Sequence, residues 1–184
     1  MPTSGIPKRK PSRPPELALT VQYGARFARL PSRARFGKWA RAALGKSARI
    51  TLRIVGAREA RALNRRYHGR DYATNVLTFA YSERRPLEGD IAICAPVVAR
   101  EARARGVSRD AHYAHLTVHS VLHLQGHDHE RASDAGRMER LEARILARLG
   151  YADPYGGEER GERREAKRFH PSPLTPHTSR KHGR

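Results

Sequence analysis

Short stretches of alternating hydrophobic and polar residues are interspersed along the chain with stretches of helical period. The clearest alternation lies at residues 49–55, where Ile50, Leu52 and Ile54 would share one face of a strand. The pattern predicts strands at residues 17–21, 49–55, 75–81 and 90–94, and helices at residues 33–45, 57–66, 95–105, 110–125 and 131–149. This order is typical of a single α+β domain in which a mixed four-stranded sheet packs with about five helices.

The two ends of the chain differ in composition from its middle. A length of 184 residues leaves room for one domain of ordinary size and additional terminal segments. Residues 1–15 and 157–184 are rich in charge and contain almost no large apolar residues. The sequence therefore predicts a folded domain at residues 16–156 between a disordered basic N-terminal tail and a disordered charged C-terminal tail.

The chain is strongly basic, with 37 Lys and Arg residues against 18 Asp and Glu residues and a net charge of +19. Each predicted tail carries +4, which leaves +11 for residues 16–156. Such an excess favours a polyanionic partner, either nucleic acid or an anionic membrane surface. An Arg-rich composition can also reflect codon usage, so charge alone does not identify the partner.

The cysteine content and the hydropathy of the chain indicate the cellular compartment in which the protein is found. The single cysteine, Cys94, excludes an intrachain disulfide and a cysteine-based zinc site, and it is predicted to be a buried strand residue. The apolar residues at 16–20 form too short and too polar a segment for a signal peptide. No stretch approaches the roughly 18 apolar residues of a membrane span. We therefore expect a cytoplasmic protein.

Six of the ten histidines lie between residues 112 and 129. His119 and His123 are four residues apart, so on a helix both imidazoles can reach one ion from the same face. Gly126 allows a left-handed residue that ends the helix, after which His129 can return as a third ligand. Three histidines with no fourth protein ligand describe a catalytic zinc site at a helix end, with one position open to water.

Other interpretations of the same histidines remain open. The rings could simply form hydrogen bonds in the interior. His127 competes with His129 as third ligand, although the break at Gly126 should carry His127 off the helical face. His112 and His115 extend this face and are either partners of the ligands or, more simply, core residues. Histidine ligands also accept nickel or copper.

The ligand spacing H-x3-H-x2-G-x2-H is that of metzincin proteases, in which a Glu directly follows the first histidine as general base. Ser120 occupies that position here, and a serine hydroxyl cannot take a proton from a metal-bound water near neutral pH. Proteolysis by that route is therefore disfavoured. Phosphodiester hydrolysis agrees with both the missing Glu and the positive charge.

Four segments, at residues 63–79, 89–94, 119–129 and 149–155, closely resemble the YbeY family of bacterial endoribonucleases. The resemblance implies a single α+β domain over about residues 16–156 and one Zn²⁺ per chain, bound by His119, His123 and His129. It further implies cleavage of single-stranded RNA in the cytoplasm, in association with the small ribosomal subunit. The family's roles are maturation of ribosomal RNA, notably the 3′ end of 16S rRNA, and ribosome quality control.

The sequence departs from the family at His68, where an Arg thought to help position substrate or water is usual. His68 could still donate a hydrogen bond to phosphate, or Arg70 or Arg66 could take over, but a histidine ring and an Arg fork are not equivalent. We name His68 and Arg70 as candidate positioning residues, with a harmless surface substitution at His68 as the equal alternative. Ser120 replaces a common Gly and should be tolerated.

The leading hypothesis is a zinc-dependent, single-strand-specific endoribonuclease acting on rRNA precursors, with RNA and the small ribosomal subunit as partners and no membrane. Asp128 and Glu130 flank the third ligand and could orient an imidazole, accept a proton or stabilise the start of the last helix. One alternative function is a peptidase or other zinc hydrolase. Another is a non-catalytic ribosome assembly or RNA-binding factor in which the metal is structural.

Overall fold

The computed structural model describes residues 14–24, 27–82, 86–127 and 132–156. All of the predicted C-terminal tail, residues 1–13 of the predicted N-terminal tail, and Asp128, His129 and Glu130 lie outside these residues. Within the described parts, the elements run in the order β1 (Leu17–Tyr23), α1 (Arg33–Ala43), β2 (Ala48–Val55), α2 (Ala57–His68), β3 (Val76–Ser82), β4 (Leu87–Cys94), α3 (Ala95–Ala104), α4 (Arg109–Leu124) and α5 (Ala132–Arg148).

All four predicted strands and all five predicted helices are present, and most bounds differ by one or two residues. The largest difference is at β4, which begins three residues before the predicted start. Leu87 is buried and pairs with Ala48, but Glu88 and Gly89 interrupt the hydrophobic pattern that the prediction used. Cys94 is a buried strand residue, as predicted.

The four strands form one mixed sheet in the order β1-β2-β4-β3. β1 pairs with β2 and β2 pairs with β4 in parallel, whereas the edge strand β3 runs antiparallel to β4. The predicted α+β architecture with a mixed four-stranded sheet is confirmed.

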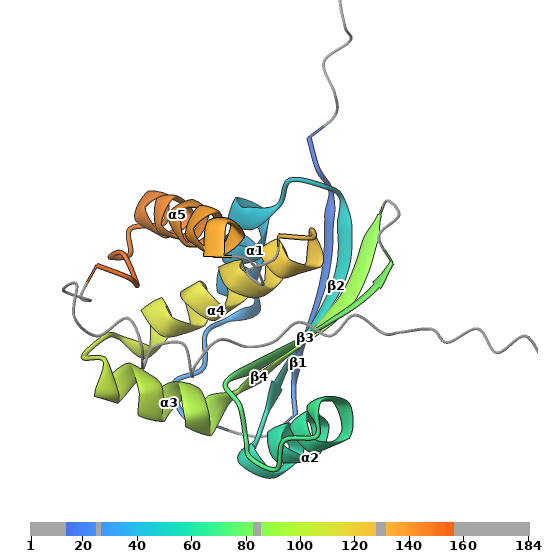
Figure 1. The fold of residues 1–184 in the computed structure, drawn as a ribbon, viewed down its shortest axis with the longest axis vertical. Coiled ribbons are helices and arrows are strands. Elements are labelled where there is room, and N and C mark those ends of the chain that lie inside the picture. Colours follow the sequence, from blue (N-terminus) through green and yellow to red (C-terminus); the bar gives the residue numbers. More distant parts are fainter. Residues whose placement is uncertain (1–13, 25–26, 83–85, 128–131, 157–184) are drawn as a thin grey trace, which may run out of the picture.

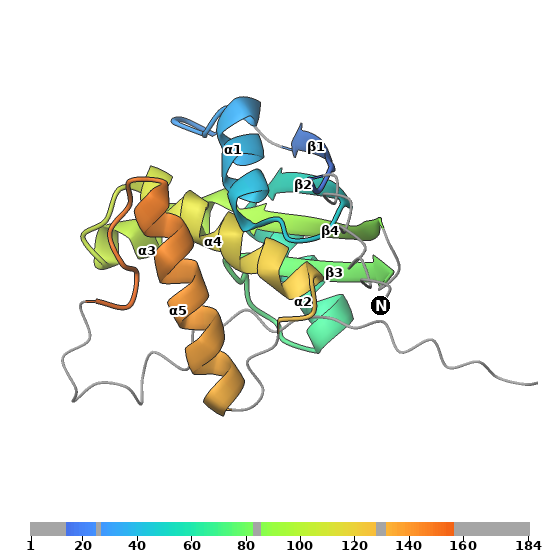
Figure 2. The ribbon, with the colours of Figure 1, turned by 90° about the horizontal axis from the view of Figure 1, so that it is seen from above.

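The sheet separates two hydrophobic cores. The larger core lies on the face covered by α1 and α4, and it contains Ile50, Leu52 and Ile54 from the central strand β2. The smaller core lies on the other face under α2, around Val55 and Leu77. α5 packs on the outer side of α4 and α1, which makes a second helical layer on the larger core (Figures 1 and 2).

The helix α4 is the central element of the helical side. Its first turn is capped by Ser108, whose hydroxyl oxygen accepts a hydrogen bond from the backbone N–H of Ala111 at 3.1 Å. Every residue from 116 to 124 is buried, so side chains around the whole circumference of this part of the helix lie in the interior. The chain leaves the helix through Gly126, which has the predicted left-handed backbone (φ 83°). His119 and His123, which lie in this part of α4, are thus held by packing.

None of the described helices is long and apolar enough to cross a membrane.

Close packing of α4 on the sheet depends on Gly89 in β4. A Cβ atom added at this glycine would lie 2.5 Å from the carbonyl oxygen of Phe79 and even closer to Cδ2 of Leu124. The Phe79 oxygen belongs to the neighbouring strand, so it cannot move without disturbing the β3–β4 pairing.

We therefore expect Gly89→Ala to lower the free energy of unfolding by about 1–3 kcal/mol, the usual cost of overpacking a core. Chemical denaturation followed by circular dichroism measures this. Gly136→Ala is the matched control, because its added Cβ would meet only the flexible end of Arg140 within α5. Alanine favours a helix over glycine by up to about 1 kcal/mol, so the control should be slightly stabilised. Equal stability of Gly89→Ala and the parent would show that the sheet and α4 can separate freely here.

Candidate metal centre

Two predicted ligands, His119 and His123, face each other on consecutive turns of α4. Their Nε2 atoms are 3.0 Å apart and their ring centroids 4.4 Å apart. Both side chains are buried among the residues of the larger core. The helix thus brings two imidazole nitrogens to a single point, as their spacing in the sequence predicts.

A buried carboxylate from α5 adjoins this pair. Glu142 is completely inaccessible to solvent, and its Oε1 lies 2.7 Å from Nδ1 of His119. Its Oε2 lies 3.1 Å from Nε2 of His115 and accepts a hydrogen bond from the hydroxyl of Tyr155. Burial alone would raise the pKa of Glu142, but the charge of His119 and the hydrogen bonds from His115 and His119 outweigh it and lower the pKa. Glu142 is therefore an ionised carboxylate with three donors around it.

This arrangement fixes the proton on His119. Because Nδ1 donates to Glu142, the nitrogen that remains for a metal ion is Nε2, the atom that faces His123. A carboxylate that binds the far nitrogen of a histidine in this way is the usual support of a histidine metal ligand. It sets the ring orientation and makes the ligating nitrogen more basic.

The distance between the two nitrogens also fits a metal ion. Two nitrogens bound tetrahedrally to one zinc at about 2.0–2.1 Å lie roughly 3.3 Å apart, close to the 3.0 Å found here. His119 and His123 would hold the ion through Nε2. The predicted third ligand, His129, lies outside the described residues. His127, its competitor, is exposed after the turn at Gly126.

A second grouping is possible, because ligand atoms of His115, His119 and Glu142 all lie within 4.8 Å of one another. Both oxygens of Glu142 are already occupied by hydrogen bonds, which favours the His119 and His123 pair as the ligands and Glu142 as their support. Burial lowers the pKa of His115, which the hydrogen bond to Glu142 partly opposes, so the His115 ring is a neutral donor to the carboxylate.

The roles of Glu142 and Tyr155 were not predicted from the sequence, and His115 was assigned most simply to the core. One signal was available for Glu142. It lies on the apolar face of α5 between Met138 and Ile145, and the other buried side chains in the described part of this helix are hydrophobic. An acidic residue on such a face needs buried partners, and a histidine-rich neighbouring helix supplies them.

The structure does not join His68 or Arg70 to this cluster by any hydrogen bond between described residues. His68 ends α2, on the opposite face of the sheet from α4, and its Nε2 is buried without a hydrogen-bond partner. Burial and the nearby charge of Arg70 lower the pKa of His68. Arg70 itself is exposed and donates to the hydroxyl of Tyr72 at 3.4 Å. Their positioning roles stay predictions.

His112 has a different partner from the other histidines of α4. Its Nε2 lies 2.7 Å from Oε2 of Glu101 on α3, and the side-chain amide of Asn75 donates to the same oxygen at 3.0 Å. His112 thus links α4 to α3 and to the start of β3, and it makes no contact with Glu142 among the interactions of the described residues.

Fold and site together define an α+β protein with a buried histidine centre supported by a carboxylate between two helices. A family model described as "Endoribonuclease YbeY" matches residues 32–150. A protein of Nitrosomonas europaea named "Endoribonuclease YbeY" is 52% identical over 155 residues, which are 84% of this chain and 94% of that protein. A protein of Thiobacillus denitrificans with the same name is 57% identical over 143 residues, covering 77% of this chain and 97% of that one. The chain belongs to the YbeY family, which confirms the resemblance seen in its motifs.

Because Glu142 holds the ring of His119 in place, its replacement should weaken metal binding. Glu142→Gln keeps the shape of the side chain but removes the charge, and its amide cannot accept hydrogen bonds at both ends. We expect zinc affinity to fall about 10- to 100-fold, measured by competition with a chromophoric chelator. Glu88→Gln is the matched control, because Glu88 pairs with Arg49 on the exposed side of the sheet. An unchanged zinc affinity in folded Glu142→Gln would contradict the supporting role.

Proposed function

We propose that this protein is a metal-dependent endoribonuclease that hydrolyses phosphodiester bonds in single-stranded RNA. The observation that carries the proposal is the facing His119 and His123 pair, with Glu142 behind it, in a chain that shares about half its residues with proteins named as endoribonucleases. Within this activity, we propose rRNA precursors as substrates, the 3′ end of 16S rRNA as the site of action, and a contribution to ribosome quality control.

His119, His123 and His129 are the proposed ligands of one zinc ion. When bound, zinc would polarise a phosphoryl oxygen and lower the pKa of its bound water to about 7. Glu142 does not serve as the general base in this proposal, since it is completely buried and both of its oxygens accept hydrogen bonds. Its contribution is to hold the His119 ring in one orientation and one tautomer. His68 and Arg70 are proposed to position phosphate or water.

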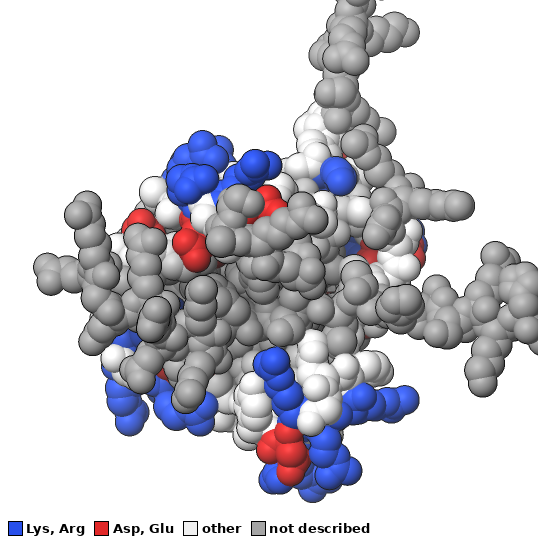
Figure 3. All heavy atoms as spheres, in the orientation of Figure 1, with Lys and Arg blue, Asp and Glu red and all other residues white. Residues whose placement is uncertain are grey.

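The exposed surface of α2 supports RNA as the partner. Lys and Arg side chains gather over this helix at the lower edge of Figure 3. Arg58, Arg65 and Arg66 are exposed and form no salt bridge with another described residue, unlike Arg61, which pairs with Asp71 at 2.6 Å. These cations are available for phosphate groups.

Exposed aromatic rings accompany these cations. Tyr67 and Tyr72 are 46% and 51% exposed, and the Tyr67 ring is held edge-on against Phe79 at 5.0 Å. The guanidinium of Arg66 lies 5.5 Å from the centre of the Tyr67 ring. Basic side chains interleaved with exposed rings suit single strands, because unpaired bases can stack on the rings while phosphates meet the cations.

The proposed partners and compartment follow from the same substrate. The small ribosomal subunit is the assembly that contains 16S rRNA, and the free, buried Cys94 agrees with the reducing cytoplasm. The alternative to an enzyme is a ribosome assembly factor. Such a protein would bind RNA through its basic surface, and its metal ion would have only a structural role.

The proposal is tested with the purified protein and a labelled single-stranded rRNA-precursor fragment. The zinc-loaded protein should cleave the fragment, cleavage should stop with a chelator, and added zinc should restore it. His119→Ala/His123→Ala, verified as folded, should lose cleavage by at least two orders of magnitude, because the remaining residues cannot hold the ion. Equal cleavage by protein and variant would refute the metal mechanism. RNA binding without cleavage by the zinc-loaded protein would favour the assembly factor.

The α2 surface predicts a salt dependence that can be measured separately. Arg65→Ala/Arg66→Ala should weaken binding of single-stranded RNA and reduce the slope of log affinity against log salt by about 1.4, since each phosphate contact contributes about 0.7 for single strands. Fluorescence anisotropy at several salt concentrations provides the slope. Lys38→Ala/Arg41→Ala on α1 is the control, because it removes the same exposed charge from the other side of the sheet. Equal effects of the two variants would indicate binding by net charge alone.

A further inference from the structure

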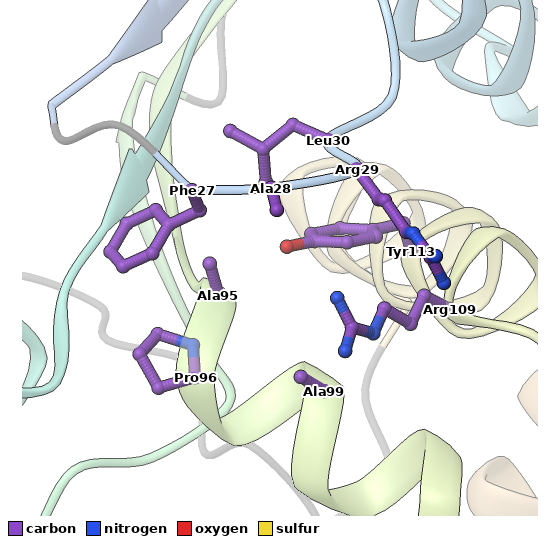
Figure 4. Close-up of a pocket in the computed structure, with 9 residues that line it drawn as sticks. All are labelled: Phe27, Ala28, Arg29, Leu30, Ala95, Pro96, Ala99, Arg109 and Tyr113. Atoms are coloured by element: carbon purple, nitrogen blue, oxygen red, sulfur yellow. The ribbon is translucent and has the colours of Figure 1, made fainter.

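A second site lies at the opposite end of α4 from the facing histidines. It is a cavity of about 240 Å³ between the segment that follows β1 and the first turns of α3 and α4 (Figure 4). Its walls include Phe27, Ala95 and Ala99 as apolar residues and Arg29, Arg109 and Tyr113 as polar ones. None of these residues belongs to the metal centre. Tyr113 and His123 are ten residues apart on one helix, or about 15 Å along its axis.

One wall of the cavity is formed by Tyr113, whose hydroxyl is available to a ligand. Tyr113 is only 2% exposed, and its hydroxyl points into the cavity between Phe27 and Ala95. This hydroxyl makes no hydrogen bond with another described residue, so it can donate to a ligand in the cavity. Burial raises the pKa of Tyr113 to about 12, so the group remains a protonated donor at neutral pH.

Two arginines, Arg29 and Arg109, line the same cavity. The guanidinium of Arg109 points into the space next to the Tyr113 hydroxyl, while the side chain of Arg29 runs along the other side of the tyrosine ring (Figure 4). Neither forms a salt bridge with a described residue, and the lining contains no Asp or Glu. Arg29 also has a left-handed backbone (φ 61°), which is costly for a residue with a side chain and is commonly retained where function requires it.

The start of α3 adds to the positive field. Ala95 and Ala99 belong to the first turns of this ten-residue helix, whose N-terminus has no side-chain cap. The helix dipole favours an anion near this end, and Pro96 in the first turn supplies no N–H group. Three kinds of group thus face one small space: two guanidiniums, a hydroxyl donor and a helix start.

We propose that this cavity binds the phosphate of a small phosphate monoester, no larger than a mononucleotide. The phosphate lies between the guanidinium of Arg109 and the hydroxyl of Tyr113, near the start of α3, and Arg29 closes the site from the side. The remainder of the ligand contacts the apolar wall at Phe27. A free nucleotide and the 5′-phosphate end of an RNA share this chemistry. The site is independent of the endoribonuclease activity proposed above.

The test uses the full-length, zinc-loaded protein and isothermal titration with inorganic phosphate and with adenosine 5′-monophosphate in chloride buffer. Arg109→Ala should weaken binding at least tenfold and Tyr113→Phe about three- to tenfold, because they remove a charged and a neutral hydrogen bond, respectively. Arg103→Ala is the matched control, an exposed arginine of α3 outside the cavity. It should leave affinity unchanged.

Further measurements separate this site from the metal centre and identify the source of the phosphate. Binding should persist in His119→Ala/His123→Ala, and its loss there would assign the phosphate to the metal instead. Tyr113→Phe should melt at or above the temperature of the parent without phosphate, since the hydroxyl has no partner to lose. A melting temperature of Tyr113→Phe far below that of the parent would show that the hydroxyl does have a partner within the protein.

A comparison of short RNAs with 5′-phosphate and 5′-hydroxyl ends then distinguishes the sources. Preference for the phosphorylated RNA over adenosine 5′-monophosphate identifies an RNA end, and the reverse identifies a free nucleotide. The proposal is wrong if phosphate and the nucleotide show no saturable binding in the millimolar range, or if Arg103→Ala and Arg109→Ala weaken binding equally.

Discussion

The carboxylate of Glu142 imposes the main constraint on the helical half of this protein. A charge removed entirely from water is stable only where donors surround it, and here they come from α4 and from the segment after α5. The position of α5 on α4 is therefore fixed by a few directional contacts as well as by apolar packing. The same contacts determine which nitrogen of His119 carries a proton, so helix docking and metal chemistry depend on one group.

The mixed sheet gives these contacts a rigid base and divides the molecule by function. On one face, α4 lies close to β3 and β4 because Gly89 leaves no side chain in the way. On the other face, α2 exposes arginines and Tyr67 and buries only a narrow stripe of residues. The centre proposed for chemistry and the surface proposed for RNA are thus carried by opposite faces of one sheet. An RNA strand that used both would have to pass around the edge strand β3.

The sequence predicted the secondary structure well because most elements have an uninterrupted hydrophobic period, and because Gly126 gives a clear end signal for α4. It predicted the His119 and His123 pair because helical spacing alone brings residues four apart together. Glu142 was missed because its partners lie 23 and 27 residues away, and no local pattern shows that two helices will meet there. The cavity at Tyr113 was missed for the same reason, since its walls come from three separate segments. The position of His68 on the face of the sheet opposite α4 likewise depends on tertiary packing.

Ser120 shows how the fold restricts the chemistry that this centre can acquire. The residue directly follows His119, is fully buried, and has a hydroxyl without a hydrogen-bond partner among the described residues. A glutamate at this position would have to place a longer, charged side chain in a closely packed interior. A single substitution therefore cannot convert the histidine pair into the centre of a peptidase with a glutamate base. Evolution toward that activity would first require α4 to move away from its neighbours.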